Sequence, residues 1–340
     1  MICPRDHGVW FRGRIASHVS IPPEISCIKD VAMKRALPVF FLLLLPLALF
    51  AGGQSEPSTA TEPVVIEEAY QVDIVDSYGR SISFSEAPQR IISVAPSITE
   101  FVYALGAGDR LIGRTDFCNY PAAVNDIESI GSLREPNLER IVELNPDVVL
   151  VSTHFTEDNL NTLEELGIVV VSLYNEESFE GVYELARIMG ELLDTEDAAE
   201  ALVDEMRETV AMVTERIATV NERPKVYYVV GFGQWGDYTA GGDTFIGEMI
   251  VMAGGDNIAS DVEGWSYSFE KIVENDPEII ICSEFYDTPA SLQAAEGYGD
   301  LNAIKNGNLR PLNNNLIDRQ GPRLADGLLA LATTIHPDLF

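Results

Sequence analysis

The sequence predicts an α/β protein with two similar lobes that a long helix joins. One segment occurs twice: residues 138–152 read LERIVELNPDVVLVS and residues 269–283 read FEKIVENDPEIIICS, with six of fifteen positions identical. Each copy has the pattern of a short amphipathic helix, a Pro-containing turn and a buried strand. A continuous helical pattern lies between the copies. Because clefts between similar lobes bind ligands, the repeat also predicts a ligand cleft.

The joining helix is expected from two helical patterns, 179–193 and 196–220, which break only near Asp194 and Thr195. The second pattern has 25 residues, which corresponds to about 37 Å at the rise of an α-helix. A helix of this length is long enough to bridge two lobes.

The other elements follow in an order typical of parallel sheets, with strands and helices alternating. Within residues 70–86, apolar and polar residues alternate on both sides of Asp-Ser-Tyr-Gly, which predicts a hairpin. Strands are expected at 90–95, 111–115, 148–152, 169–173, 225–230 and near 309–313. Helices are expected at 97–105, where Ser97 and Glu100 have capping-box spacing, and at 137–144, 159–166, 244–252 and 322–336.

The N-terminal region predicts export. Residues 33–35 are Met-Lys-Arg, residues 36–50 are apolar, and residues 51–53 are Ala-Gly-Gly. This order is typical of a cleaved signal peptide at 33–53. No cysteine directly follows the apolar run, so the sequence predicts a periplasmic or secreted protein without a lipid anchor. We expect residues 1–32 to be untranslated or disordered, with Met33 as the start, and residues 54–69 to form a disordered tether.

The exported part is strongly acidic. Residues 54–340 contain 16 Lys and Arg against 51 Asp and Glu, a net charge of −35. Such a surface repels nucleic acids and anionic lipids. We therefore expect no nucleic-acid partner, and an arginine in a pocket becomes a candidate for function.

Cysteine and histidine are scarce in the exported part: Cys118, Cys282, His154 and His336. A disulfide between the two lobes would hold a cleft shut, so we expect two free thiols. Two histidines are too few to predict a multi-histidine site for a bare transition metal, and no direct metal ligand is assigned.

Catalytic signatures such as GxSxG, HExxH or a Walker lysine are missing from the sequence. The stretch Gly231-Phe-Gly-Gln-Trp-Gly follows a strand and has the GxGxxG spacing of a dinucleotide loop, but no helix follows it. We therefore expect a binding protein and no enzyme. An exported α/β enzyme that uses the Gly231 loop is the alternative.

Aromatic residues gather where predicted strands end, which is where α/β sheets bind ligands. Loops do not bury many rings in a core, so as a set these residues predict the lining of a cleft. The candidates are Phe117, Phe155, Trp235, Tyr238, Trp265, Tyr267 and Tyr286, and His154 and Phe285 belong to the same set of rings.

Two arginines lie in predicted loops: Arg134 before the first repeat copy and Arg319 before the last helix. In so acidic a chain, loop arginines that face a cleft favour an anionic or metal-chelated ligand. Arg323 lies in the first turn of the last helix, where we expect a structural role.

Glu139 and Glu270 occupy the same position, the second, in the two repeat copies. A glutamate at a helix start is ordinary, since the helix dipole favours it. Two equivalent carboxylates, one in each lobe, would also fit two equivalent basic patches of a two-fold symmetric partner.

Five stretches, in order along the chain, give the sequence a resemblance to the periplasmic solute-binding proteins of ABC importers for ferric siderophores, haem and cobalamin. They are RIISVAPSITEFVYALGAGDRLIG, IGSLREPNLERIVELNPDVVLVS, TFIGEMIVMAGGDNIA, GWSYSFEKIVENDPEIIICS and GPRLADGLLALATTIHP. The resemblance implies two Rossmann-like lobes joined by one backbone helix, with the ligand between them. It implies an N-terminal lobe at 70–178, linking helices at 179–222 and a C-terminal lobe at 223–340.

The resemblance further implies that Glu139 and Glu270 dock onto permease arginines, that the protein is a monomer, and that the lobes close only slightly. It implies no cofactor, only a bound iron chelate or corrinoid. Cobalamin binders of this kind have a Trp where Leu133 stands, an aromatic at Trp265 and a Tyr at Phe117. Arg134 and Arg319 favour a ferric siderophore or haem, and cobalamin is the alternative.

Overall fold

The computed structural model describes residues 70–234 and 236–340. The expected signal peptide, tether and upstream segment therefore lie outside the described residues, as does Trp235. The described residues belong to one unit, Val65–Phe340.

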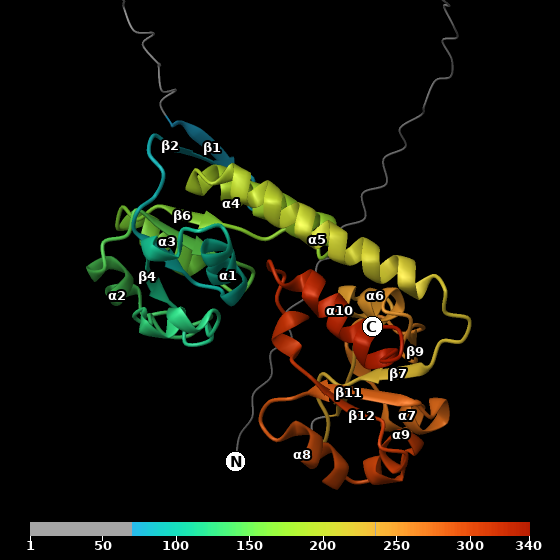
Figure 1. Ribbon diagram of the computed structural model, residues 1–340. Coiled ribbons are helices and arrows are strands. Elements are labelled where there is room, and N and C mark those ends of the chain that lie inside the picture. Colours follow the sequence, from blue (N-terminus) through green and yellow to red (C-terminus); the bar gives the residue numbers. More distant parts are fainter. Residues whose placement is uncertain (1–69, 235) are drawn as a thin grey trace, which may run out of the picture. The chain divides into compact units, whose positions relative to one another are not determined.

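The N-terminal lobe is built on a parallel four-stranded sheet of order β4-β3-β5-β6 (Figure 1). Its strands are β3 (Ile91–Ser93), β4 (Leu111–Arg114), β5 (Val148–Val151) and β6 (Val170–Ser172). All of β5 is buried, as expected for a strand that helices cover on both faces.

The C-terminal lobe is built on a second parallel sheet, of order β12-β11-β7-β9. Its strands are β7 (Lys225–Tyr228), β9 (Asp256–Asn257), β11 (Ile279–Ser283) and β12 (Leu309–Leu312). Read from the other edge, the order β9-β7-β11-β12 repeats that of the first sheet. The two copies of the repeat thus supply equivalent strands, β5 and β11, and the predicted two-lobe α/β fold is confirmed.

The predicted helices around the sheets agree with the structure to within a few residues. They are α1 (Pro96–Ala104), α2 (Leu138–Glu143), α3 (Glu157–Glu165), α6 (Phe245–Met252), α7 (Phe269–Asn275) and α10 (Leu324–Ile335). Two short helices between β11 and β12, α8 (Thr288–Ala294) and α9 (Asn302–Lys305), were not predicted from the sequence. Short 3-10 turns occur at Gly108–Arg110, Ala122–Asp126, Tyr298–Asp300 and Asn314–Leu316.

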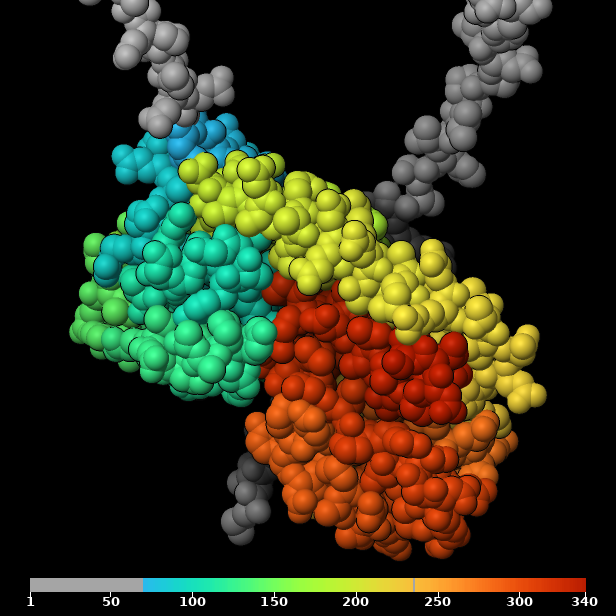
Figure 2. Space-filling model, viewed as in Figure 1, coloured from blue at the N-terminus to red at the C-terminus, as the bar shows by residue number. Residues whose placement is uncertain are grey.

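The linking helices are α4 (Phe179–Leu193) and α5 (Glu196–Ile217). Ser178 caps α4 by accepting a hydrogen bond from Gly181, and Asp194 ends it in the left-handed conformation at φ 56°. That residue breaks the pattern at the expected place. Helix α5 packs against both α4 and α10 (Figure 2).

Two small antiparallel ribbons complete the fold. The expected hairpin is formed by β1 (Val72–Val75) and β2 (Ser81–Phe84), with Val72 opposite Phe84. The second ribbon pairs β8 (Asp237–Tyr238) with β10 (Ser266–Tyr267). It occupies the glycine-rich region considered above as a dinucleotide loop, and no described helix begins directly after that loop.

The largest apolar core contains one face of each sheet together with α4, α5 and α10. The opposite faces of the two sheets have their own, smaller cores. Cys118 and Cys282 are buried free thiols in these cores, as expected. Burial raises the pKa of Cys282 to about 11, so this thiol stays protonated and unreactive at neutral pH.

One local prediction is wrong. Helix α1 begins at Pro96 with Ala95 as its N-cap, and no side chain caps it. Glu100, which the spacing assigned to a capping box, is instead buried and points away from the helix start into an ion-pair network described below. Within the described residues, every helix is too short or too polar to cross a membrane.

Candidate functional site

A cavity of about 450 Å³ lies at the carboxyl ends of the first sheet's strands. Parallel sheets bind ligands at this edge, and the volume suits a small-molecule site. Three lining segments follow β3, β5 and β6 directly: 94–97, 152–155 and 173–177. The rest of the wall consists of Phe117, Leu133, Gly181, Val182, Leu185 and residues 318–320 before α10.

Four of the residues predicted to line the cleft meet at this cavity: Phe117, His154, Phe155 and Arg319. The ring of Phe117 is 53% exposed, so it is available to a ligand. Phe155 is 5% exposed and forms the apolar floor. Arg319 reaches the cavity from the segment before the last helix.

The other predicted ligand residues do not line this cavity. Arg134 is exposed in the loop before α2, next to the lining residue Leu133. Tyr238 and Trp265 are 39% and 42% exposed on or beside the β8–β10 ribbon. Tyr286 is 97% exposed, in a backbone with φ 56°.

Tyr267 differs from these because it is a core residue, 5% exposed. Its hydroxyl donates to the carbonyl of Ile258 at 2.7 Å and accepts from Asn275. Its ring packs on Tyr227 at 6.3 Å between centroids. Both hydrogen bonds of the hydroxyl are internal, so we no longer count Tyr267 among the ligand contacts.

Arg319 does not offer a free positive charge to the cavity. Its Nη1 lies 2.7 Å from Glu100 Oε1, and its Nη2 donates to the carbonyl of Phe117 at 3.3 Å. Arg323 donates to both oxygens of Glu100 and stacks over Tyr120, with Cζ 3.8 Å from the ring centroid. The structural role expected of Arg323 therefore rests on Glu100, a partner that the sequence did not indicate.

Two polar side chains beside Arg319 also face the cavity. Asp318 accepts hydrogen bonds from Asn314 and Tyr228. Desolvation raises the pKa of Asp318, although the hydrogen bonds from Asn314 and Tyr228 and the charge of Arg319 oppose that shift. Gln320 Oε1 is buried without a hydrogen-bond partner among the described residues, so it is available to accept from a ligand.

Sequence reasoning missed several lining residues, of which Tyr174 carries the most chemistry. Tyr174 follows β6, as His154 follows β5 beside Phe155. It could have been found by the rule already applied to His154 and Phe155, that residues directly after parallel strands line the site. His154 is exposed and lies 3.1 Å from Thr153 Oγ1 through Nδ1.

Glu139 and Glu270 occupy equivalent places at the starts of α2 and α7, and both are exposed. Each helix is capped in the same way, by Asn137 and by Ser268, which accept from the backbone amide three residues on. Neither glutamate forms an ion pair with another described residue.

The fold and the cavity define a two-lobe binding protein, and comparison with known proteins gives its family. The model for "Periplasmic binding protein" matches residues 91–316. The chain is 30% identical over 314 residues to an uncharacterized ABC transporter substrate-binding lipoprotein, YvrC, of Bacillus subtilis, with 91% of this chain and 99% of that protein covered. It is 31% identical over 280 residues to a cobalamin-binding protein of Halobacterium salinarum, covering 79% and 75% of the two chains.

Among solved structures, a periplasmic heme-binding protein from Pseudomonas aeruginosa superposes with a TM-score of 0.67 at 28% identity, covering 74% of this chain and 93% of that one. The chain therefore belongs to the periplasmic binding protein family, whose members bind substrates for transport and are not enzymes. The enzyme alternative is thereby set aside on family grounds.

Proposed function

We propose that the protein is the substrate-binding component of an ABC importer and that it carries a corrinoid of the cobalamin type to the permease. The observation that carries the ligand class is the charge balance of the cavity. Among its described lining residues Arg319 is the one arginine, and it is already paired with Glu100 at 2.7 Å, whereas Asp318, Glu176 and Glu177 line the same cavity. The sequence alone had favoured a ferric siderophore or haem because Arg134 and Arg319 were expected to face the ligand.

A corrinoid suits this wall because its rim carries neutral amide groups that donate hydrogen bonds. Gln320 Oε1 lacks a donor, and the carboxylates of Asp318, Glu176 and Glu177 line the same space. These groups accept hydrogen bonds, whereas an anionic chelate would bring like charge toward three carboxylates. Phe117 and Phe155 supply apolar surface for a flat macrocycle. A relative at 31% identity is named as a cobalamin-binding protein, which supports the same ligand.

Haem is the second candidate, favoured by His154 and Tyr174. Imidazole and phenolate groups are both axial ligands of haem iron, and both side chains line the cavity. The heme-binding relative from Pseudomonas aeruginosa supports this alternative.

A titration of the protein that starts at Gln54 with cobalamin, haem and ferric siderophores separates the two candidates. Binding is followed by tryptophan fluorescence and visible absorption. We expect cobalamin to saturate the protein at one equivalent and the other compounds not to bind. A haem complex whose Soret band shifts in His154→Ala would establish the second candidate. If no compound in the panel saturates, the proposed ligand class is wrong.

Delivery to the permease is assigned to Glu139 and Glu270, whose equivalent positions at α2 and α7 support docking on a two-fold symmetric permease dimer. The domain limits, the monomeric state and the cleavage of a signal peptide at 33–53 remain parts of this proposal. The Bacillus relative is named a lipoprotein, whereas this sequence has no cysteine directly after its apolar run. We therefore propose release into the periplasm without a lipid anchor.

A further inference from the structure

We propose that Ser77, in the turn of the β1–β2 hairpin, is a positioning residue that holds Tyr174 in the wall of the corrinoid cavity. The inference rests on the proposed function, because it assigns the hairpin a part in ligand binding. The hairpin precedes the matched family region, residues 91–316, and contributes no lining residue of its own.

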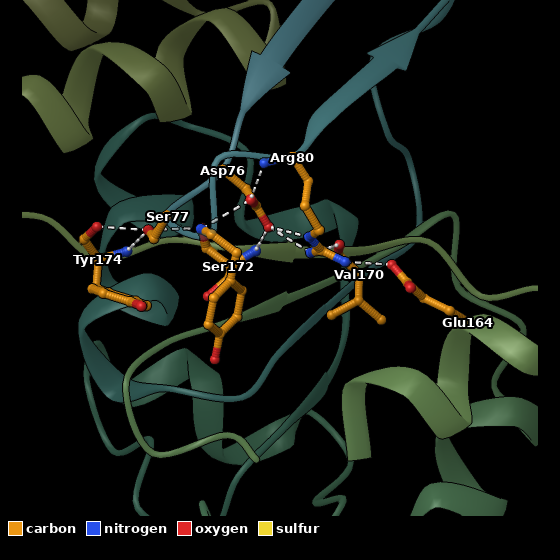
Figure 3. A network of polar contacts seen from close by, with 8 residues as sticks. Asp76, Ser77, Arg80, Glu164, Val170, Ser172 and Tyr174 are labelled. Atoms are coloured by element: carbon orange, nitrogen blue, oxygen red, sulfur yellow. Dashed lines mark hydrogen bonds and ion pairs between the residues drawn. The ribbon is translucent and has the colours of Figure 1, made fainter. Parts of the chain in front are cut away.

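Ser77 contacts the chain where β6 ends and the cavity wall begins. Its hydroxyl lies 2.6 Å from the carbonyl oxygen of Tyr174 and 2.9 Å from that of Ser172, and accepts from the Tyr174 amide at 2.7 Å. Its own amide donates to the Ser172 carbonyl at 2.9 Å. Figure 3 shows Ser77 beside Tyr174 and Ser172, with these contacts as dashed lines. One side chain thus satisfies both backbone groups of Tyr174.

Asp76 fixes the turn that presents Ser77. One of its oxygens accepts from the amides of Tyr78 and Arg80, each at 3.0 Å, and the other accepts from the Arg80 guanidinium and the Ser172 amide. Arg80 also donates to the Val170 carbonyl at 2.9 Å and pairs with Glu164 (Figure 3). The turn therefore forms hydrogen bonds with β6 and with the residues just after it, from Val170 to Tyr174.

The rings of Tyr78 and Tyr174 add a contact at the same place. Their centroids are 6.1 Å apart and their planes meet at 87°, the edge-to-face arrangement that aromatic pairs favour. Tyr174 is thus held through its backbone by Ser77 and through its ring by Tyr78.

The wall needs this support because it lies between two elements. Strand β6 ends at Ser172 and helix α4 begins at Phe179, yet residues 173–177 all line the cavity. The backbone amide of Leu173 donates a hydrogen bond to the Val151 carbonyl at 2.8 Å. Residues 175–177 are exposed, whereas Tyr174 is half-buried.

The test compares Ser77→Ala with Ser83→Ala as a matched control. Ser83 lies on the same hairpin and its exposed hydroxyl bonds Asp73, away from the wall. We expect Ser77→Ala to weaken cobalamin binding about tenfold, the scale of one net hydrogen bond or slightly more, and Ser83→Ala to leave it within about twofold. Ser77→Ala added to Tyr174→Ala should cause no further loss, because Ser77 acts through Tyr174.

Amide hydrogen exchange of the ligand-free protein tests the positioning independently of the ligand. Exchange at residues 173–177 should accelerate in Ser77→Ala and remain unchanged in Ser83→Ala. Wild-type affinity in Ser77→Ala, additive losses in the double variant, or unchanged exchange would each overturn the inference. Failure of the parent protein to bind any chelate would refute the proposed function, while the exchange result would still decide the role of Ser77.

Discussion

Glu100 on α1 and Arg319 before α10 form an ion pair at 2.7 Å, although 219 positions separate them in the sequence. Arg323 shares the same carboxylate, and Glu100 is 3% exposed. This contact links the N-terminal lobe to the segment that leads into the last helix. It also engages the guanidinium of Arg319, the lining arginine that an anionic ligand would need as a donor.

Glu100→Gln should destabilise the protein by about 3 kcal/mol, because it leaves two largely buried guanidinium groups without their shared charge. Urea unfolding of the parent and the variant measures this difference. Glu143→Gln is the control: its ion pair with Arg140 is exposed, so its loss should cost about 0.5 kcal/mol or less. Equal midpoints for Glu100→Gln and the parent would show that the network does not stabilise the fold.

Phe117→Ala should weaken cobalamin binding about fivefold to tenfold, since a half-exposed ring on the cavity wall would lose its contact with the macrocycle. Calorimetric titration gives the affinity. Leu166→Ala removes an apolar side chain that is 57% exposed and outside the cavity, and it should bind like the parent. If both variants bind equally well, Phe117 does not contact the ligand.

Reversing the charge of both docking glutamates, Glu139→Arg with Glu270→Arg, should abolish uptake and leave ligand affinity unchanged. The repeat supplies a matched control, since Glu143 and Glu274 are the other shared glutamates and are also exposed. Uptake into vesicles that contain the cognate permease is the measurement. Uptake that persists in the first pair, or fails equally in both pairs, would refute the docking assignment.

The Asp76 carboxylate should make the free energy of unfolding depend on pH. Burial alone would raise its pKa, but hydrogen bonds from the Arg80 side chain and from the amides of Arg80 and Ser172 outweigh burial and lower the pKa below 3.8. A carboxylate with a depressed folded pKa stabilises the fold above its unfolded pKa, and this contribution is lost as the pH falls through the folded value. Urea unfolding between about pH 2 and 6 should show the advantage of the parent over Asp76→Asn shrinking below about pH 4. A constant difference would contradict the role of the ionised carboxylate.

Most of the fold follows from local periodicity. The end of α4 at Leu193 agrees with the pattern because Asp194 adopts a left-handed conformation there, and the repeat correctly predicts the equivalent strands β5 and β11. Glu100 shows where this reasoning fails, because its spacing fits a helix cap while its partners lie more than 200 residues away.

The candidate site was predicted less completely than the fold. Phe117, Phe155 and Arg319 were found because residues after parallel strands and in loops gather at one edge of a sheet. Tyr267 shows the limit of that rule, because burial of its ring depends on packing against Tyr227. Tyr174 was missed although the same rule covers it, but its bonds to a hairpin nearly 100 residues earlier could not be predicted from local pattern.

The most direct test of the proposed function is a calorimetric titration with cobalamin of the protein that starts at Gln54. The charge balance of the cavity predicts saturation at one equivalent with a dissociation constant at or below the micromolar range, about −8 kcal/mol or stronger. Absence of binding heat with cobalamin, together with saturation by haem or a ferric siderophore, would contradict the proposed ligand.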